Sequence, residues 1–304
     1  MTLRPAGAPS GAKERDESSG QLFAGCFSSD AAAAQTARLI FVGLADDSQS
    51  SYLKGAARGP LRIRHAYTGA SYNSASESGV DLAGKVFDAG DITPRGAWAL
   101  TAAAISGQAA AYFRAGRIPF FAGGDHAVSV PVIAALSAVK QKVHVIQIDA
   151  HPDLYPEYAG SKSSHACVAA RLLEMPHVAS VTQYGIRTMN APQQAVAREH
   201  RKRLHIFQAH VLTGTLPQPA HLPDDAPVFL DIDLDGFDPA YAPGVSHPVP
   251  GGISPRQALN FLHAAKFRLM GMSAVELNPE QDEGNRSAIL AGRLLHEGMG
   301  YALK

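Results

Sequence analysis

The sequence predicts an α/β protein in which a mainly parallel sheet carries helices on both faces. Short apolar runs alternate along the 304-residue chain with longer segments of helical periodicity, so the connections between strands are long crossovers. The run 142–150 is apolar nearly throughout, which is typical of a parallel strand covered on both faces. No Pro/Gly/Ser linker divides the chain after about residue 35, so we expect a single domain over residues 36–304.

The expected strands are compact apolar runs that end at glycine or at a charged residue. KVHVIQIDA is the clearest example, and RIPFFAGG breaks on two glycines. The expected strands cover residues 37–45, 85–92, 117–124, 142–150, 178–186, 227–234 and 268–278. Ligands of open parallel sheets bind beyond the carboxyl ends of the strands, so we look for chemistry there.

The expected helices fill the intervals between these strands. The small residues of the segment 96–115 suit close packing, and Pro131 limits where the next helix begins. Ser254 followed by Pro255 is a helix N-cap signature. The expected helices cover residues 54–67, 96–115, 128–139, 165–175, 191–203, 254–267 and 287–303.

Composition and charge exclude several functions. The 27 Lys and Arg residues balance 27 Asp and Glu residues, so nothing global favours nucleic acid or an anionic membrane. No apolar run approaches the roughly 18 residues of a membrane-spanning helix, and the N-terminus lacks the apolar core of a signal peptide. Cys26 and Cys167 fit a reducing compartment. We therefore expect a cytoplasmic protein.

Residues 1–35 are expected to form a disordered N-terminal tail. Small polar residues, Gly and Pro dominate through about residue 20. Such a segment buries too little apolar surface to offset the entropy lost on ordering it.

One segment of the chain is strongly acidic despite the overall balance. No Lys or Arg occurs from Leu204 to Pro255, while six aspartates lie there: Asp224, Asp225, Asp231, Asp233, Asp235 and Asp238. Four of them crowd into DIDLDGFD, directly after the apolar run PVFL. Carboxylates at a strand end repel one another and are costly to desolvate unless a cation neutralises them. A divalent metal is one interpretation, and solvated aspartates that form turns are the other.

Three more motifs, GGDH, DAHPD and VELNP, follow expected strands at the same edge of the sheet. In an extended DAHPD, alternation points the side chains at i, i+2 and i+4 to one face. Together, the motifs GGDH, DAHPD and DIDLD supply two imidazoles and four carboxylates: His126, Asp149, His151, Asp153, Asp233 and Asp235. This set is too large for one tetrahedral zinc and suits two ions that share carboxylates, with Mn(II) favoured and Fe, Co, Ni or Zn open.

Each motif alone has a structural alternative. GGDH is typical of a tight turn, and DAHPD can be an N-cap aspartate followed by an incidental histidine. The convergence of these motifs on several strand ends of one sheet favours the metal site. Two ions in such a site can share a water molecule and lower its pKa toward neutrality.

GGDH, DAHPDL and DIDLDGFDPAYAPG resemble the three signature blocks of the ureohydrolase family: arginases, agmatinases, guanidinobutyrases and formimidoylglutamases. The resemblance extends from residues 55–64 through 88–91 to 275–279. It implies a three-layer α/β/α sandwich, commonly assembled as trimers or hexamers. It also implies that one ion is bound by His126, Asp149, Asp153 and Asp233, and the other by Asp149, His151, Asp233 and Asp235.

The resemblance further implies hydrolysis of a guanidino carbon to urea and an amine. Glu276 in VELNP matches the family position that binds the guanidinium group. A carboxylate suits this role because it can accept two parallel N–H bonds. His165 in SSHAC matches the histidine that passes a proton to the leaving amine. The structural alternatives are a surface glutamate before a turn and a histidine that only begins a helix.

The loop after DAHPD departs from the arginase pattern. Tyr155 stands where arginases have an asparagine, and Ser161 keeps the serine position without the Gly-Asn that follows it. Glu157 and the loop tyrosines suit a small or cationic substrate, or else the tyrosines simply pack the rim. His247 in VSHP replaces part of the GTGTP of agmatinases, and Asp231 replaces a small hydroxyl residue.

The expected substrate is therefore a small cationic guanidino compound. Agmatine, guanidinobutyrate, guanidine and N-alkylated guanidines or biguanides stay open, as does Ni(II) in place of Mn(II). The alternatives are a formimidoylglutamase-type hydrolase and a subunit that works with a paralogous chain. A non-catalytic subunit would be expected to lose ligands, and none is missing here. A deacetylase of similar architecture would use one zinc and fewer carboxylates.

Overall fold

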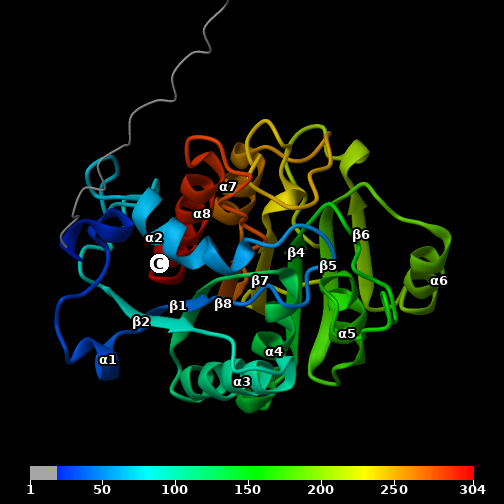
Figure 1. Ribbon diagram of the computed structural model, residues 1–304, viewed down its shortest axis with the longest axis horizontal. Coiled ribbons are helices and arrows are strands. Elements are labelled where there is room, and N and C mark those ends of the chain that lie inside the picture. The colour runs from blue at the N-terminus through cyan, green and yellow to red at the C-terminus, as the bar shows by residue number, and fades with distance from the viewer. Residues whose placement is uncertain (1–18) are drawn as a thin grey trace, which may run out of the picture.

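The computed structural model describes residues 19–304, and the first 18 residues of the predicted tail lie outside the described residues. An eight-stranded sheet has the order β2-β1-β3-β8-β7-β4-β5-β6, and neighbouring strands are parallel throughout (Figure 1). The strands are β1 (Leu39–Leu44), β2 (Val86–Ile92), β3 (Ile118–Ala122), β4 (Val143–Ile148), β5 (Val178–Ile186), β6 (Leu204–Gln208), β7 (Pro227–Asp233) and β8 (Arg268–Val275). The predicted fold class, a mainly parallel sheet with helices around it, is confirmed.

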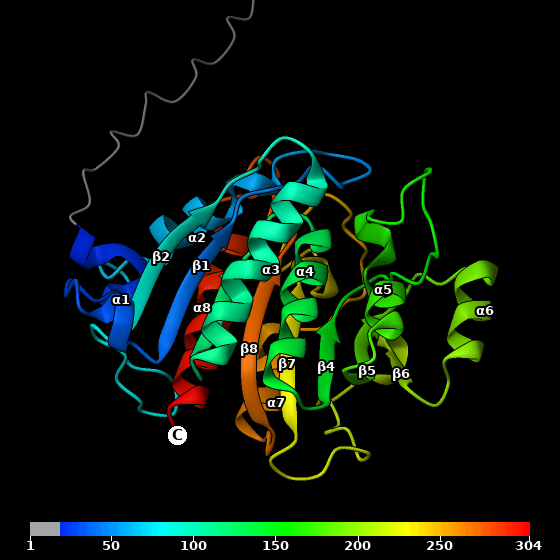
Figure 2. The ribbon, with the colours of Figure 1, turned by 90° about the horizontal axis from the view of Figure 1, so that it is seen from below.

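Helices cover both faces of this sheet and bury two apolar cores. α3, α4 and α5 lie over one face, in front of the sheet in Figure 2, while α2, α7 and α8 cover the other. The helices are α1 (Ala33–Thr36), α2 (Gly59–Ala66), α3 (Trp98–Arg114), α4 (Ser129–Ala134), α5 (Val168–Glu174), α6 (Ala191–Glu199), α7 (Pro255–His263) and α8 (Arg286–Ala302). Ser254 caps α7 as predicted, because its side chain accepts a hydrogen bond from the backbone N–H of Gln257 in a capping box.

β6 is the strand of this sheet that the sequence pattern missed. The pattern predicted a helix through residue 203, whereas α6 ends at Glu199. β6 lies at the edge of the sheet and pairs only with β5. Of its five residues only Leu204 is buried. An edge strand that buries so few residues needs no continuous apolar run, so the sequence pattern did not indicate a strand here.

The structure corrects the end of the predicted tail. The 3₁₀ helix η1 (Ser19–Gly25) and all of α1 except Thr36 lie within the segment predicted as disordered. Phe23 and Cys26 are fully buried, and the Phe23 ring lies 5.3 Å from that of Phe27 and 5.1 Å from that of Phe41. The segment FAGCF supplies apolar side chains that offset the cost of ordering it, so the prediction of disorder is wrong from about residue 22 onward.

The strand order brings the motif-bearing strands together. β3, β8, β7 and β4 are adjacent in the middle of the sheet, although they are far apart in the sequence. Because all strands run parallel, the segments that follow these four strands meet at one edge. Among the described residues no helix combines the length and apolar character needed to cross a bilayer.

Candidate metal centre

Four central strands each deliver one part of the site. His126 begins the 3₁₀ helix η3 (His126–Val128) after β3, and Asp149 directly follows β4. Asp233 ends β7, and Glu276 directly follows β8. The turn after β3 needs glycine where two backbone segments approach closely, because a side chain at Gly124 would collide with the carbonyl group of Asp46. All four residues are at least 97% buried.

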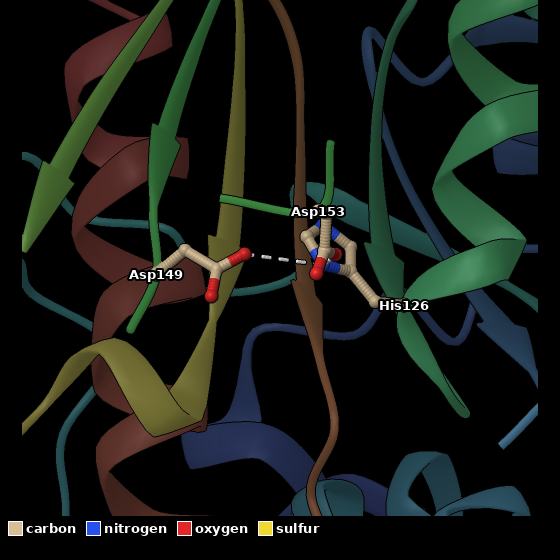
Figure 3. A group of neighbouring side chains, drawn as sticks. All are labelled: His126, Asp149 and Asp153. Atoms are coloured by element: carbon tan, nitrogen blue, oxygen red, sulfur yellow. Dashed lines mark ion pairs between the residues drawn. The ribbon is translucent and has the colours of Figure 1, made fainter. Parts of the chain in front are cut away.

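The first group of carboxylates surrounds His126. Its Nδ1 atom lies 2.9 Å from Asp153 Oδ2 and 3.3 Å from both Asp149 Oδ2 and Asp233 Oδ2. Figure 3 shows His126, Asp149 and Asp153 pointing toward one another. His126 Nδ1 and Asp149 Oδ2 are buried without a hydrogen-bond partner among the described residues. Two orphaned atoms of this kind, facing each other among carboxylates, fit a bound cation.

The second group shares Asp149 with the first. His151 Nδ1 lies 2.9 Å from Asp235 Oδ2 and 3.9 Å from Asp149 Oδ1, so the two oxygens of Asp149 face different histidines. His126, Asp149 and Asp153 could hold one ion, and Asp149, His151 and Asp235 a second. Asp149 belongs to both of these three-residue groups, whereas Asp233, the other predicted bridging ligand, belongs to neither, and the predicted ligand sets stay a prediction. The structure brings all six predicted ligands to one site.

The buried carboxylates of the cluster repel one another and are stabilised by positive charge. Burial raises the pKa values of Asp149 and Asp233, and the neighbouring carboxylate of Asp235 raises both further. Burial alone would lower the pKa of His126, but Asp231 and the neighbouring carboxylates of Asp149 and Asp153 hold it well above its ordinary value. In the absence of a metal ion, protons must supply the charge that the carboxylates require.

His165 and Glu276 form a pair beside the cluster. Glu276 Oε1 accepts hydrogen bonds from His165 Nδ1 at 2.9 Å and from the backbone N–H of His126 at 2.8 Å. The other ring nitrogen of His165 lies 2.8 Å from Ser51 Oγ. Burial alone would lower the pKa of His165, but Glu276 raises it to about 9. Glu276 adopts a positive φ of 64°, a strained backbone conformation that is typical of functional sites.

A pocket of about 440 Å³ opens onto this cluster. Of the predicted substrate-binding residues, Tyr155 and His247 line it, whereas Glu157 is exposed and, like Ser161, lies outside the lining. The His247 ring is 5.0 Å from that of His165 and 6.1 Å from that of His151. Glu276 also lies outside the lining, behind His165.

The sequence analysis missed the part of the pocket wall that follows β5. Met189, Asn190 and Gln193 line the pocket, and Asn190 donates a hydrogen bond to the Tyr155 hydroxyl. The sequence offered one indication of this wall: the segment follows an expected strand, so it lies at the same edge of the sheet as the other motifs. Asp231, which the sequence marked only as a replacement, lies fully buried behind His126.

A parallel α/β fold with a buried His/Asp cluster beyond its strand ends defines a metal-dependent hydrolase. The chain belongs to the arginase family, whose model matches residues 37–300. It is similar to "Arginase 1, mitochondrial" of Arabidopsis thaliana, with 34% identity covering 82% of this chain and 76% of the relative. It is also similar to an agmatinase of Bacillus anthracis, with 28% identity covering 86% and 91% of the two chains. The predicted ureohydrolase resemblance is confirmed.

Solved structures agree with this assignment. An arginase from Medicago truncatula has a TM-score of 0.77 and 28% identity, covering 88% of this chain and 87% of its own. A Trypanosoma cruzi formiminoglutamase solved with Mn²⁺ shares the fold, with a TM-score of 0.78, 22% identity and coverage of 93% and 99%. The protein is a metal-dependent amidinohydrolase that acts on C–N bonds.

Proposed function

We propose that this protein hydrolyses a small guanidino compound to urea and an amine with two divalent ions, Mn(II) being favoured and Ni(II) the alternative. The orphaned pair His126 Nδ1 and Asp149 Oδ2 carries the proposal, because a cation satisfies both atoms at once. The first ion would be held by His126, Asp149, Asp153 and Asp233, and the second by Asp149, His151, Asp233 and Asp235. Mn(II) suits this mixture of carboxylate oxygens and imidazole nitrogens.

The residues around the cluster would divide the remaining work. The two ions, when bound, supply a water molecule of lowered pKa and charge stabilisation for its attack. Glu276 orients His165 through their hydrogen bond. Because it lies outside the pocket lining, it would bind the guanidinium group, as the sequence predicts, only if His165 moved aside. His165, protonated at neutral pH because of Glu276, faces the pocket and can pass a proton to the leaving amine.

The pocket wall supports a substrate without a carboxylate. No Lys or Arg belongs to the lining formed by the described residues, so a carboxylate tail would find no lysine or arginine to pair with. Away from the metal ligands, the wall consists largely of neutral groups such as Tyr155, Tyr158, Met189 and Asn190. Burial and the neighbouring His165 lower the pKa of His247, which therefore stays uncharged at neutral pH. We propose agmatine, guanidine or an N-alkylated guanidine rather than arginine or guanidinobutyrate.

A substrate panel tests this proposal. Protein loaded with Mn or Ni is incubated with agmatine, guanidine, metformin, arginine and 4-guanidinobutyrate, and urea release is measured. We expect urea release from one of the first three compounds and little from arginine and 4-guanidinobutyrate, which carry a carboxylate. Formamide from formimidoylglutamate, with no urea from any guanidine, would make the protein a formimidoylglutamase-type hydrolase instead. The Asp224→Ala variant serves as the control, because this aspartate of the same acidic segment is 78% exposed.

Assembly is a separate proposal. Members of the family are commonly oligomeric, and we propose a homotrimer or homohexamer. Light scattering of purified protein measures the mass directly. Activity that appears only when a paralogous chain is added would support the hetero-oligomeric alternative.

A further inference from the structure

Asp231 is a buried carboxylate that lies behind the metal centre and is absent from the pocket lining. It occupies the middle of β7, two residues before Asp233, and is fully buried. Its Oδ2 atom lies 3.0 Å from His126 Nε2 and accepts a hydrogen bond from Gln147 Nε2 at 3.1 Å. Asp231 therefore reaches the site through a ligand and does not touch the substrate space.

The other oxygen of Asp231 is held just as firmly. Oδ1 accepts hydrogen bonds from Ser129 Oγ at 2.7 Å and from Ser273 Oγ. Gln147 in β4 and Ser273 in β8 stand in register with Asp231 on the two strands that flank β7. Three adjacent strands and the start of α4 thus hold this carboxylate in one orientation.

We propose that Asp231 is a positioning residue that fixes the ring of His126 and so sets the affinity of the first ion. The inference rests on the proposed dinuclear site. The Asp231 carboxylate accepts a hydrogen bond from Nε2–H of His126, which leaves the Nδ1 lone pair free for an ion held with Asp149 and Asp153. Partners of this kind are worth about 10–100-fold in metal affinity.

The two histidines of the site differ in this respect. His151 also turns Nδ1 toward carboxylates, but no described residue forms a hydrogen bond with its Nε2 atom, and its side chain is 29% exposed. The support of Asp231 is therefore confined to the ion bound by His126. Loss of Asp231 should weaken one ion and spare the other.

The test measures metal binding rather than turnover. Stepwise Mn²⁺ affinities and metal content after dialysis are compared for wild type, D231S and D231N. D231S removes the carboxylate that accepts from His126 Nε2, so we expect one retained ion per chain and a dissociation constant for the other raised about 10–100-fold. D231N keeps an oxygen that can accept from His126 Nε2, so it should retain most of the affinity.

Two reference variants assign the ion that is lost. D153A removes a proposed ligand of the first ion alone, and D235A removes one of the second. D231S should reproduce the D153A pattern, and the double variant D153A/D231S should lose little more than D153A does. Tyr67→Phe breaks an equally buried hydrogen bond to His296 and should keep both ions, because neither residue is a proposed ligand or part of the pocket lining.

The outcomes separate this inference from the proposed function. Wild-type protein that binds fewer than two ions would overturn the dinuclear site. If wild type binds two, unchanged affinities in D231S, or equal weakening of both ions, would overturn the positioning role. If D231S does not fold, D231A decides, because alanine also removes the carboxylate that accepts from His126 Nε2: weakening confined to the first ion supports the role, and equal or no weakening overturns it.

Discussion

His126 and His296 are both almost fully buried, yet only one of them belongs to a site. His296 in α8 has both ring nitrogens satisfied, Nδ1 by the Tyr67 hydroxyl at 2.9 Å and Nε2 by the carbonyl of Ser74 at 3.0 Å. His126 has a partner at Nε2, but its Nδ1 faces three carboxylate oxygens without a hydrogen bond. A buried imidazole is thus a structural residue when both nitrogens are paired and a candidate ligand when one is left open.

The surrounding charge separates the same two histidines. Burial lowers the pKa of His296 and so disfavours its charged form. The carboxylates around His126 outweigh burial and raise its pKa well above the ordinary value. Only the surroundings of His126 favour a divalent ion, because the ion would replace a proton on the cluster and bind the unpaired Nδ1 atom of His126.

The largest expected effect comes from removing a shared carboxylate of the His126 cluster. Asp233→Ala should abolish urea release, because the proposal makes Asp233 a ligand of both ions. Metal content by mass spectrometry should fall together with turnover, while the exposed Asp224→Ala control keeps both. Activity retained with intact metal content would contradict the bridging role.

The next effect concerns a histidine that acts without holding metal. His165→Ala should lower turnover about 10²–10⁴-fold, the usual contribution of a general acid. Both ions should stay bound, which steady-state kinetics and metal analysis measure on the same sample. His210→Ala, an exposed histidine, is the matched control. An unchanged rate in His165→Ala would dismiss the proton-transfer role.

A smaller effect is expected at the satisfied histidine. Tyr67→Phe leaves His296 Nδ1 buried without its partner, which should cost about 1–3 kcal/mol of the free energy of unfolding. Denaturant unfolding measures this loss, and urea release per folded molecule should stay at the wild-type level. Loss of bound metal in this variant would break the contrast between the two histidines.

The smallest effect is a pH dependence of stability in metal-free protein. The pKa of His165 is raised from 6.5 to about 9, so its pairing with Glu276 stabilises the fold fully below pH 6.5 and is lost as pH rises through about 9. Between pH 7 and 10 we expect a decline of about 1 kcal/mol, or roughly 2–4 °C in Tm. His165→Gln should flatten this part of the profile, and an equally steep decline in that variant would contradict the assignment.

Most of the fold could be read from the sequence because the signals are local. The apolar runs of β4 and β7 mark buried strands wherever they lie in the sheet. The same runs locate the metal ligands, since acidic and histidine motifs follow them directly. β6 and the segment around Phe23 escaped this reasoning, because an edge strand and a terminal segment owe their structure to packing against distant elements.

The sequence by itself determined the fold class, the family and the residues able to bind metal. Only the tertiary structure decided which side chains share a space. It placed β3, β8, β7 and β4 side by side, put Asp231 behind His126, and left Glu157 outside the pocket while adding Asn190 to its wall. The physical reason is that strand order and side-chain packing depend on contacts between residues far apart in the chain, and no local pattern records those contacts.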